Sequence, residues 1–428
     1  MNFDKLVEYF ACEGTVLLLD SQSEDHNWSR KSYLAARPQA EIKAMGSHIL
    51  LKQNERGKTF EGDPWEMLQT LREERQGWLL GYLGYDLKNH LENLTSKNWD
   101  GTEAPDMYFM EPGFLMEFNR ISGDYRVLIG ELPEDKNFSE QKASSSEFSL
   151  IHLSCRTSQE AYLEKIRKAQ RRISEGDFYE INLSHQIKGT FRGSAWALYQ
   201  RMAEVGPVPF GAYLEVDNVK ICCQSPERFL RKEGEKVFSQ PIKGTAKRSD
   251  CREQDDLLKK ELLDSPKEKA ENLMIVDLVR NDLSRIARHG SVKVTELFGI
   301  QSFGTVHQMV STVEALTEER DPVSVIKACF PMGSMTGTPK ISAMKAIEEY
   351  EDYKRGIYSG AIGYITPNGN FDFNVVIRTA IIKKDEIFYS VGGAVTSDSI
   401  PANEWQETLI KARALLDTVG TAKKIELS

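Results

Sequence analysis

The stretch that indicates the fold most clearly is residues 211–245, GAYLEVDNVKICCQSPERFLRKEGEKVFSQPIKGT. Its many apolar and β-branched residues predict a run of strands. At its end, Lys243 lies between a proline that fixes the backbone before it and a glycine that frees the backbone after it. We therefore expect Lys243 to be held on a shaped turn rather than to extend freely from a helix surface. The alternative is an ordinary solvated lysine at the end of a strand.

The rest of the chain places strands and helices in clusters. Apolar runs predict strands, and helical periodicity with capping residues predicts helices. Clusters of each kind, without strict alternation, favour an α+β fold with large, mainly antiparallel β-sheets packed with outer helices. The strands are expected at 15–20, 77–87, 108–117, 125–129, 178–186, 360–366 and 371–382, and the helices at 66–75, 265–288 and 402–419.

Residues 131–150 are charged, rich in serine and poor in apolar side chains, which predicts a solvated linker. They divide the chain into an N-terminal region, 1–150, and a second domain, 151–428.

Three helix starts can be located. Thr157 and Glu160 form a capping box, and Ser265 caps a helix whose third residue is Glu268. Thr338 is expected to cap a helix after the Gly-rich loop GSMTGTPK, residues 333–340.

Composition and charge limit the class of function. Of 428 residues, 40% are hydrophobic and 28% charged, as in ordinary globular enzymes. The net charge of −9 gives no basic surface for nucleic acid or anionic membranes. No apolar run is long enough to span a bilayer, and no signal peptide is visible. Six cysteines without a CxxC pair indicate reduced thiols. We expect a cytoplasmic enzyme that acts on small molecules.

Two Glu-x-x-Glu pairs are candidate metal ligands: Glu268 with Glu271, and Glu404 with Glu407. This spacing puts both carboxylates of a pair on one helix face. If the two helices converge, only a cation or protonation makes so many like charges tolerable, and Mg²⁺ prefers such oxygen ligands. Separately, Glu268 can simply close a capping box, and Glu407 can pair with Lys411.

Other side chains have both a catalytic and a structural interpretation. Glu227 is a candidate proton donor or a salt-bridge partner of a nearby arginine. His307 is a candidate ligand or a structural histidine in an alternating strand. Arg378, expected on one strand face with Asp372 and Asn374, suits a carboxylate. The Gly392-Gly393 pair can present backbone N–H groups to an anion.

Several motifs in order resemble those of the chorismate-utilising enzymes. The resemblance covers about residues 157–415 and extends less clearly into the N-terminal region. The motifs are QSPERF (224–229), PIKGT (241–245), ENLMIVDLVRNDLSR (271–285), GSMTGTPK (333–340), YSGAIGY (358–364), FNVVIRTA (373–380) and GGAVTSDSIPANEWQETLIKA (392–412).

Within that family, the residue between Pro-Ile and Gly-Thr separates activities. Members with lysine there make 4-amino-4-deoxychorismate from chorismate and ammonia, the step before p-aminobenzoate in folate synthesis. Anthranilate synthases typically have alanine. Isochorismate and salicylate synthases place a general-base lysine in the strand matching 179–183, where this chain has Glu180. The glutamine typical of ammonia-using members is also absent there. Lys243 therefore implies the first activity, with anthranilate synthesis as the alternative.

The resemblance also implies roles for the candidate residues. Lys243 would attack ring C2 while Glu227 protonates the departing C4 hydroxyl, and ammonia would then attack C4 and expel the lysine. Glu271 and Glu407 would hold Mg²⁺ against the ring carboxylate, with Glu268 and Glu404 in support through water. The remaining pocket residues would be Thr245, His307, Tyr358, Arg378, Gly392, Gly393 and Lys411.

The chain lacks a G-x-C-x-G nucleophile motif, so the resemblance implies a separate glutaminase subunit of the class I glutamine amidotransferase type as the source of ammonia. Leu18–Ser21 is similar to a tryptophan-binding element of the anthranilate synthases. An isochorismate or salicylate synthase, or a non-catalytic scaffold that keeps the fold, are further alternatives.

Overall fold

The structure, a computed structural model, describes residues 3–22, 31–53, 56–134, 147–303 and 306–419. These residues form one sheet of 21 strands in which every strand pairing is antiparallel. The α+β fold with a large antiparallel sheet is therefore confirmed. Neighbouring strands follow each other as β8 (Phe148–Cys155), β9 (Glu180–Gly193), β21 (Glu386–Val395), β20 (Thr379–Lys383), β11 (Val219–Ser225), β10 (Phe210–Val216), β1 (Val16–Asp20), β2 (Ser32–Met45), β6 (Met107–Phe118), β5 (Leu79–Leu83), β18 (Ala361–Ile365), β19 (Phe371–Asn374), β12 (Arg228–Glu233), β13 (Lys236–Gln240), β16 (Val306–Leu316) and β15 (Lys293–Ser302).

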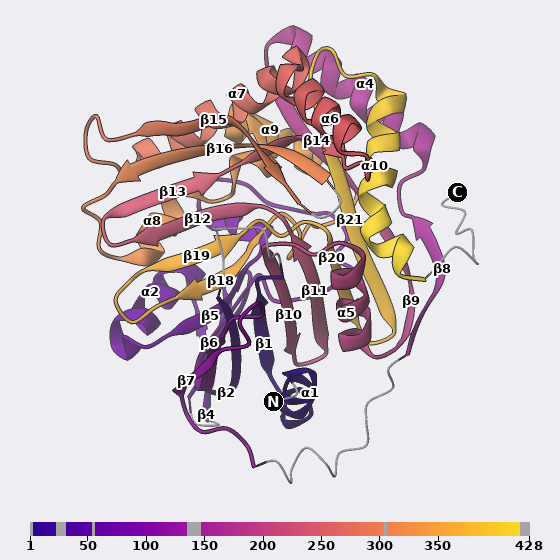
Figure 1. The fold of residues 1–428 in the computed structure, drawn as a ribbon. Helices are drawn as coiled ribbons and strands as arrows, with labels where there is room; N and C mark the ends of the chain where they lie inside the picture. Colours follow the sequence, from indigo (N-terminus) through magenta and orange to yellow (C-terminus); the bar gives the residue numbers. More distant parts are fainter. Residues whose placement is uncertain (1–2, 23–30, 54–55, 135–146, 304–305, 420–428) are drawn as a thin grey trace.

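Short strands extend this sheet at its sides. They are β3 (His48–Gln53) and β4 (Arg56–Glu61) beyond β2, β7 (Tyr125–Ile129) on β6, β14 (Ile242–Lys247) on β16, and β17 (Gly337–Thr338) on β9. The helices cover the sheet from outside, and Figure 1 shows α4, α6, α7 and α10 gathered at one end of it. The helices are α1 (Phe3–Glu13), α2 (Pro64–Arg75), α4 (Gln159–Glu175), α5 (Ala195–Val205), α6 (Arg252–Asp264), α7 (Pro266–Ser284), α8 (Pro322–Cys329), α9 (Lys340–Tyr350) and α10 (Pro401–Leu416).

The segments before and after residue 150 are interleaved in space. Strand β1 pairs with β10, and β5 pairs with β18, so N-terminal strands lie inside the sheet of the later segment. One core cluster joins Trp65 and Phe109 to Phe229 and Phe373. The sequence regions 1–150 and 151–428 thus share one sheet, and residues of both regions pack together in the same core cluster. Most of the predicted linker, 135–146, lies outside the described residues.

Local capping chemistry explains where two of the functional helices begin. Ser265 accepts a hydrogen bond from the backbone N–H of Glu268, and Pro266 occupies the first turn of α7, as predicted. For α4 the predicted cap was wrong. Ser158 caps it, because the hydroxyl of Thr157 is turned to Asp352 instead.

The predicted cap of α9 was also wrong. Thr338 belongs to β17, and Pro339 stands at the cap position before Lys340. The expected single strand 371–382 is two strands, β19 and β20, which join different neighbours in the sheet. No helix among the described residues is long and apolar enough to cross a membrane.

Candidate active site

Lys243 lies in an irregular strand where a shaped turn was expected. Strand β14 shifts its register against β16 between Ile242 and Thr245, at Gly244 with φ +84°. This left-handed conformation is costly for residues other than glycine. At this distortion the side chain of Lys243 points into the protein, where it is only 11% exposed. It is not an ordinary solvated lysine.

Lys243 is paired with Glu180 at the start of β9. Its Nζ donates a hydrogen bond to Oε1 of Glu180 at 3.0 Å. Burial lowers the pKa of Lys243, but the negative charges of Glu180, Glu271 and Glu407 outweigh burial and raise it overall. The resting lysine is therefore an ammonium group surrounded by acids.

The backbone at Glu180 is held by the Gly-rich loop. Gly337 and Thr338 of β17 pair with Ile181 and Glu180 of β9. A Cβ on Gly337 would lie 2.2 Å from the carbonyl oxygen of Glu180, so only glycine allows this close approach. The loop thus fixes the residue that holds Lys243, which the sequence alone did not indicate.

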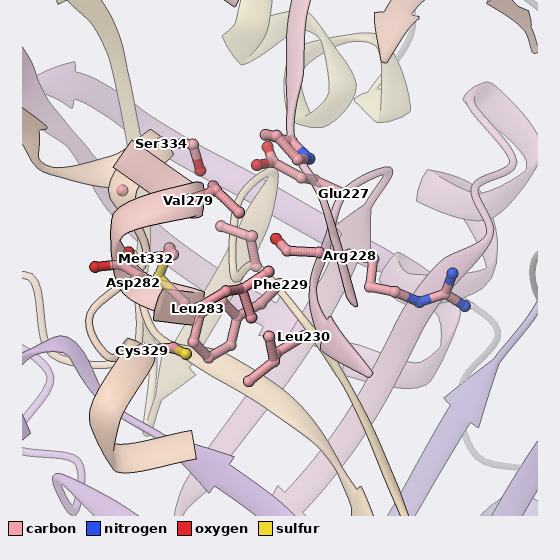
Figure 2. A pocket seen from close by; sticks show the side chains of 14 residues that line it. Glu227, Arg228, Phe229, Leu230, Val279, Asp282, Leu283, Cys329, Met332 and Ser334 are labelled. Atoms are coloured by element: carbon pink, nitrogen blue, oxygen red, sulfur yellow. The ribbon is translucent and has the colours of Figure 1, made fainter. Parts of the chain in front are cut away.

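Glu227 has the environment of a proton donor. Burial raises its pKa to about 7, although a hydrogen bond from Ser334 and the charge of Lys243 act in the opposite direction. Its carboxyl borders a small cavity of about 20 Å³, room for about one water molecule. Figure 2 shows Glu227 and Ser334 at one end of this cavity and the guanidinium of Arg228 turned away from it.

The salt-bridge interpretation of Glu227 is not what the structure shows. Arg228 forms a bidentate pair with Asp372, at 2.9 and 3.0 Å. Arg231 also pairs with Asp372 and with Glu233. These partners leave Glu227 as a buried acid near a buried lysine, an arrangement typical of proton transfer.

Arg378 and Tyr358 lie where the backbone leaves regular strand geometry. Arg378 has φ +50° in the gap between β19 and β20, and Ser359, next to Tyr358, has φ +63°. The expectation that Arg378 shares a strand face with Asp372 and Asn374 was wrong, because the strand is interrupted before Arg378. Strained residues of this kind are concentrated at functional sites.

The surroundings of Arg378 suit an anionic ligand. Burial lowers its pKa, while Tyr389 and Glu227 act to raise it. No ion pair joins Arg378 to a carboxylate of the described residues. Tyr358 is buried, and burial raises its pKa. The site therefore holds a half-buried cation and a buried phenol that a substrate carboxylate could satisfy.

Strand β21 and helix α10 bring the glycine pair to Lys411. Its Nζ donates to the carbonyl oxygen of Gly392 at 2.8 Å and pairs with Glu407 at 2.7 Å. A Cβ on Gly393 would lie 3.3 Å from Oε2 of Glu404, so glycine leaves space beside the carboxylates. The pairing of Glu407 with Lys411 that the sequence left open does occur.

The negative charges of all four glutamates of the two Glu-x-x-Glu pairs act on one lysine, Lys267. Burial lowers the pKa of Lys267, but the charges of Glu271, Glu404, Glu268 and Glu407 raise it overall. Burial raises the pKa of Glu271 and of Glu404. In each case the charge of the other glutamate of the pair, Glu268 or Glu407, raises it further. As the side chains lie, no three His, Cys, Asp or Glu residues of the described chain form a metal-holding group.

The donor chemistry nevertheless fits a hard divalent cation. All four groups are carboxylates, they come from two helices, and the charges of Lys243, Lys267 and Lys411 offset part of their mutual repulsion. Carboxylate oxygens are the ligands that Mg²⁺ uses. Glu404 is buried and the other three are half-buried, so a bound cation would also offset the cost of holding these charges away from water.

His307 and Thr245 are less closely connected with these groups. Both ring nitrogens of His307 have partners, Asp255 at 3.0 Å and Ser302 at 2.8 Å, which favours the structural interpretation. Thr245 is exposed on β14.

Sequence reasoning missed a positioning network behind the site. Arg355, 2% exposed, donates to the backbone oxygens of Asn182 and Met335 and pairs with Glu351. It thereby ties β9 to the Gly-rich loop. Its local sequence, EDYKRG, is typical of a solvated surface and gave no indication of this role.

A larger cavity of about 230 Å³ lies elsewhere, among strands β1, β2, β10 and β18. Its lining includes Leu19, Asp20 and Ser21, part of the segment expected to resemble a tryptophan-binding element. Asp20 there pairs with Arg120 and accepts a hydrogen bond from Tyr199 at 2.9 Å.

Comparison with known proteins identifies the family. The model of the chorismate binding enzymes matches residues 15–417. The chain belongs to the chorismate-binding enzyme family. The earlier resemblance on motifs is thereby confirmed over nearly the whole chain, the N-terminal region included.

The relatives include proteins named aminodeoxychorismate synthase component 1 and others named anthranilate synthase component 1. Aminodeoxychorismate synthase component 1 of Escherichia coli is 34% identical over 94% of this chain and 92% of its own length. Anthranilate synthase component 1 of Aquifex aeolicus is 31% identical over 95% and 90%. The crystal structure of anthranilate synthase component I from Streptococcus pneumoniae superimposes with a TM-score of 0.78 at 28% identity, covering 91% of this chain and 93% of the other.

Proposed function

We propose that this protein is the first component of an aminodeoxychorismate synthase, which converts chorismate and ammonia to 4-amino-4-deoxychorismate for p-aminobenzoate and folate synthesis. The observation that carries the proposal is Lys243: a buried lysine within hydrogen-bond distance of one acid and near Glu227, in a family whose members act on chorismate. The name of the Escherichia coli relative supports the same activity.

The residues divide the reaction into two substitutions. Lys243, once neutral, attacks ring C2, and Glu227 donates its proton to the C4 hydroxyl, which leaves as water. Ammonia then attacks C4, and the bond between C2 and the lysine breaks. Covalent catalysis by lysine replaces one difficult displacement by two easier ones. A carboxyl with a pKa near 7 is well suited to donate a proton at neutral pH.

The remaining residues hold the substrate. Arg378 and Tyr358 bind the enolpyruvyl carboxylate, and the backbone at Gly392 and Gly393, with Lys411, closes the other side. Thr245 completes the pocket in this proposal, whereas His307 keeps the structural role that its two hydrogen bonds indicate. Glu271 and Glu407 would hold Mg²⁺, supported through water by Glu268 and Glu404. The bound ion would neutralise the ring carboxylate.

Ammonia comes from a partner in this proposal. Relatives are named as component 1, which implies a further component. We propose a class I glutamine amidotransferase subunit as that partner. We also place the protein in the cytoplasm, because its six cysteines are all free thiols, which suits a reducing compartment.

A product assay tests the activity. The protein is incubated with chorismate, Mg²⁺ and an ammonium salt, and aminodeoxychorismate is detected as p-aminobenzoate after a lyase is added. Anthranilate as the main product would instead assign the anthranilate synthase reaction. Isochorismate or salicylate would assign water addition, and the absence of any product would favour a scaffold.

A second measurement tests the role of Lys243. Intact-mass analysis of the protein with chorismate in the absence of ammonia should show an adduct that Lys243→Ala lacks. An adduct of equal yield on the variant would refute the assignment of the nucleophile.

A further inference from the structure

The proposed function requires Lys243 to lose a proton before it attacks. The resting structure opposes this loss, because acidic groups on β9, α7 and α10 and one just before β12 act on Lys243. A proton acceptor must therefore lie within reach of Nζ, or the proton must escape to solvent from a buried site. The groups that face Lys243 are Glu180 on β9, Glu271 on α7, Glu407 on α10 and Glu227 just before β12.

Of these four acids, Glu180 is the one whose carboxylate receives a hydrogen bond from Lys243, at 3.0 Å. Direct transfer of a proton needs this kind of distance. Glu227 is assigned to the leaving hydroxyl, and Glu271 and Glu407 to the cation. Glu180 has no role in the proposed function so far.

The burial of Glu180 also suits a proton acceptor. Its side chain is 1% exposed, and its second oxygen, Oε2, has no hydrogen-bond partner among the described residues. In water, lysine and glutamate differ by about six pKa units, which makes this transfer unfavourable. In the site the proton passes along the hydrogen bond between Lys243 and Glu180 as the amine attacks, so no separate neutral amine has to accumulate.

We propose that Glu180 is the base that takes the proton from Lys243 as its amine attacks the ring. The inference rests on the proposed function and deepens it. Glu180 thus has a function at a position where related ammonia-using enzymes are expected to have glutamine and water-adding enzymes are expected to have lysine.

The protons balance over the cycle. In the first step Lys243 passes a proton to Glu180 and forms the bond to C2, while Glu227 gives its proton to the departing hydroxyl and water leaves. In the second step ammonia forms the bond to C4 as an ammonium, and the bond from C2 to the lysine breaks to release a neutral amine. Glu180 then returns its proton to Lys243, and the new C4 ammonium gives one proton to Glu227. Both acids end in their starting states.

The variant Glu180→Gln tests this role. Glutamine keeps the size of the side chain and can accept a hydrogen bond from Lys243, but it cannot take the proton. The rate of adduct formation is measured by intact mass in quenched mixtures with chorismate, without ammonia, between pH 5 and pH 7. Glu227, with a pKa of about 7, goes from almost fully protonated at pH 5 to about half protonated at pH 7, so its titration changes the rate by only about twofold across the window.

The native protein should give a nearly level rate, since its proton moves within the site. In Glu180→Gln the proton goes to solvent, so the rate should fall about tenfold per pH unit, or about 100-fold from pH 7 to pH 5. A merely structural role of Glu180 would change the rate without this slope. A level profile in Glu180→Gln would overturn the inference.

Two further variants keep the test conclusive. Lys243→Ala should give no adduct and so identifies the signal. Glu180→Asp retains a carboxylate one methylene shorter, and should be slower but level with pH; the steep slope in this variant would refute the role of the carboxylate. If Glu180→Gln does not fold by circular dichroism, the aspartate variant decides.

Failure of the inference is distinguishable from failure of the proposed function. If the native protein makes aminodeoxychorismate through the adduct and Glu180→Gln behaves like it, only the inference fails. Anthranilate, or no product, from the native protein contradicts the proposed function itself. Aminodeoxychorismate without any adduct refutes the covalent lysine and its base together.

Discussion

The replacement Glu227→Gln should impair catalysis while it stabilises the fold at alkaline pH. Burial raises the pKa of this carboxyl from its ordinary value of 4.5 to about 7. The folded protein therefore binds this proton more tightly than the unfolded chain does. Native stability is lost as pH rises from 4.5 to 7, and the loss is complete above that range. A difference of about 2.5 pKa units corresponds to about 3 kcal/mol.

Glutamine is neutral at every pH and carries no such penalty. The stability of Glu227→Gln relative to the native protein should therefore increase by about 2.5 kcal/mol between pH 5 and pH 8. Its rate of adduct formation should fall by about 10²- to 10⁴-fold, the usual contribution of a general acid. In the native protein the same rate should decline about tenfold per pH unit above pH 7, as the acid loses its proton.

Urea unfolding at pH 5 and pH 8 measures the stability effect, and quenched-flow mass spectrometry measures the rate. Glu74→Gln is the matched control, since Glu74 is an exposed glutamate on α2. The control should change neither quantity beyond a few tenths of a kcal/mol. The same stability difference between the two pH values in native protein and Glu227→Gln would refute the view of Glu227 as a buried, readily protonated acid.

Three further outcomes are expected. Arg378→Ala should lower kcat/KM for chorismate about 100-fold or more, because it removes the half-buried cation assigned to the substrate carboxylate, and an unchanged KM and kcat would contradict that role. Asp372→Ala should destabilise the fold by about 3–5 kcal/mol in urea unfolding, since Arg228 would lose the partner of a buried pair; a change below 1 kcal/mol would show that the pair is unimportant. Glu271→Gln should weaken Mg²⁺ binding in isothermal titration calorimetry as well as activity, and unaltered Mg²⁺ binding would exclude Glu271 as a ligand.

Sequence reasoning was most successful where the cause of a structure is local. The cap at Ser265 followed from the residues of the first turn of α7. It was less successful where a distant residue competes for the same group. Thr157 could have capped α4 as well as Ser158 does, but Asp352, far along the chain, takes its hydroxyl. The break before Arg378 was missed because β19 and β20 join different partner strands.

Residues 211–245 contain by themselves the strands, the buried acid and the lysine between proline and glycine that indicate the family and its chemistry. These features depend on backbone freedom and side-chain type, which are properties of single residues and their neighbours. Only the tertiary structure decided what Lys243 meets. Glu180 lies 63 positions away in the sequence, and β14 and β9 are not neighbours in the sheet. A contact of this kind depends on how the whole sheet folds over itself, and no local pattern records it.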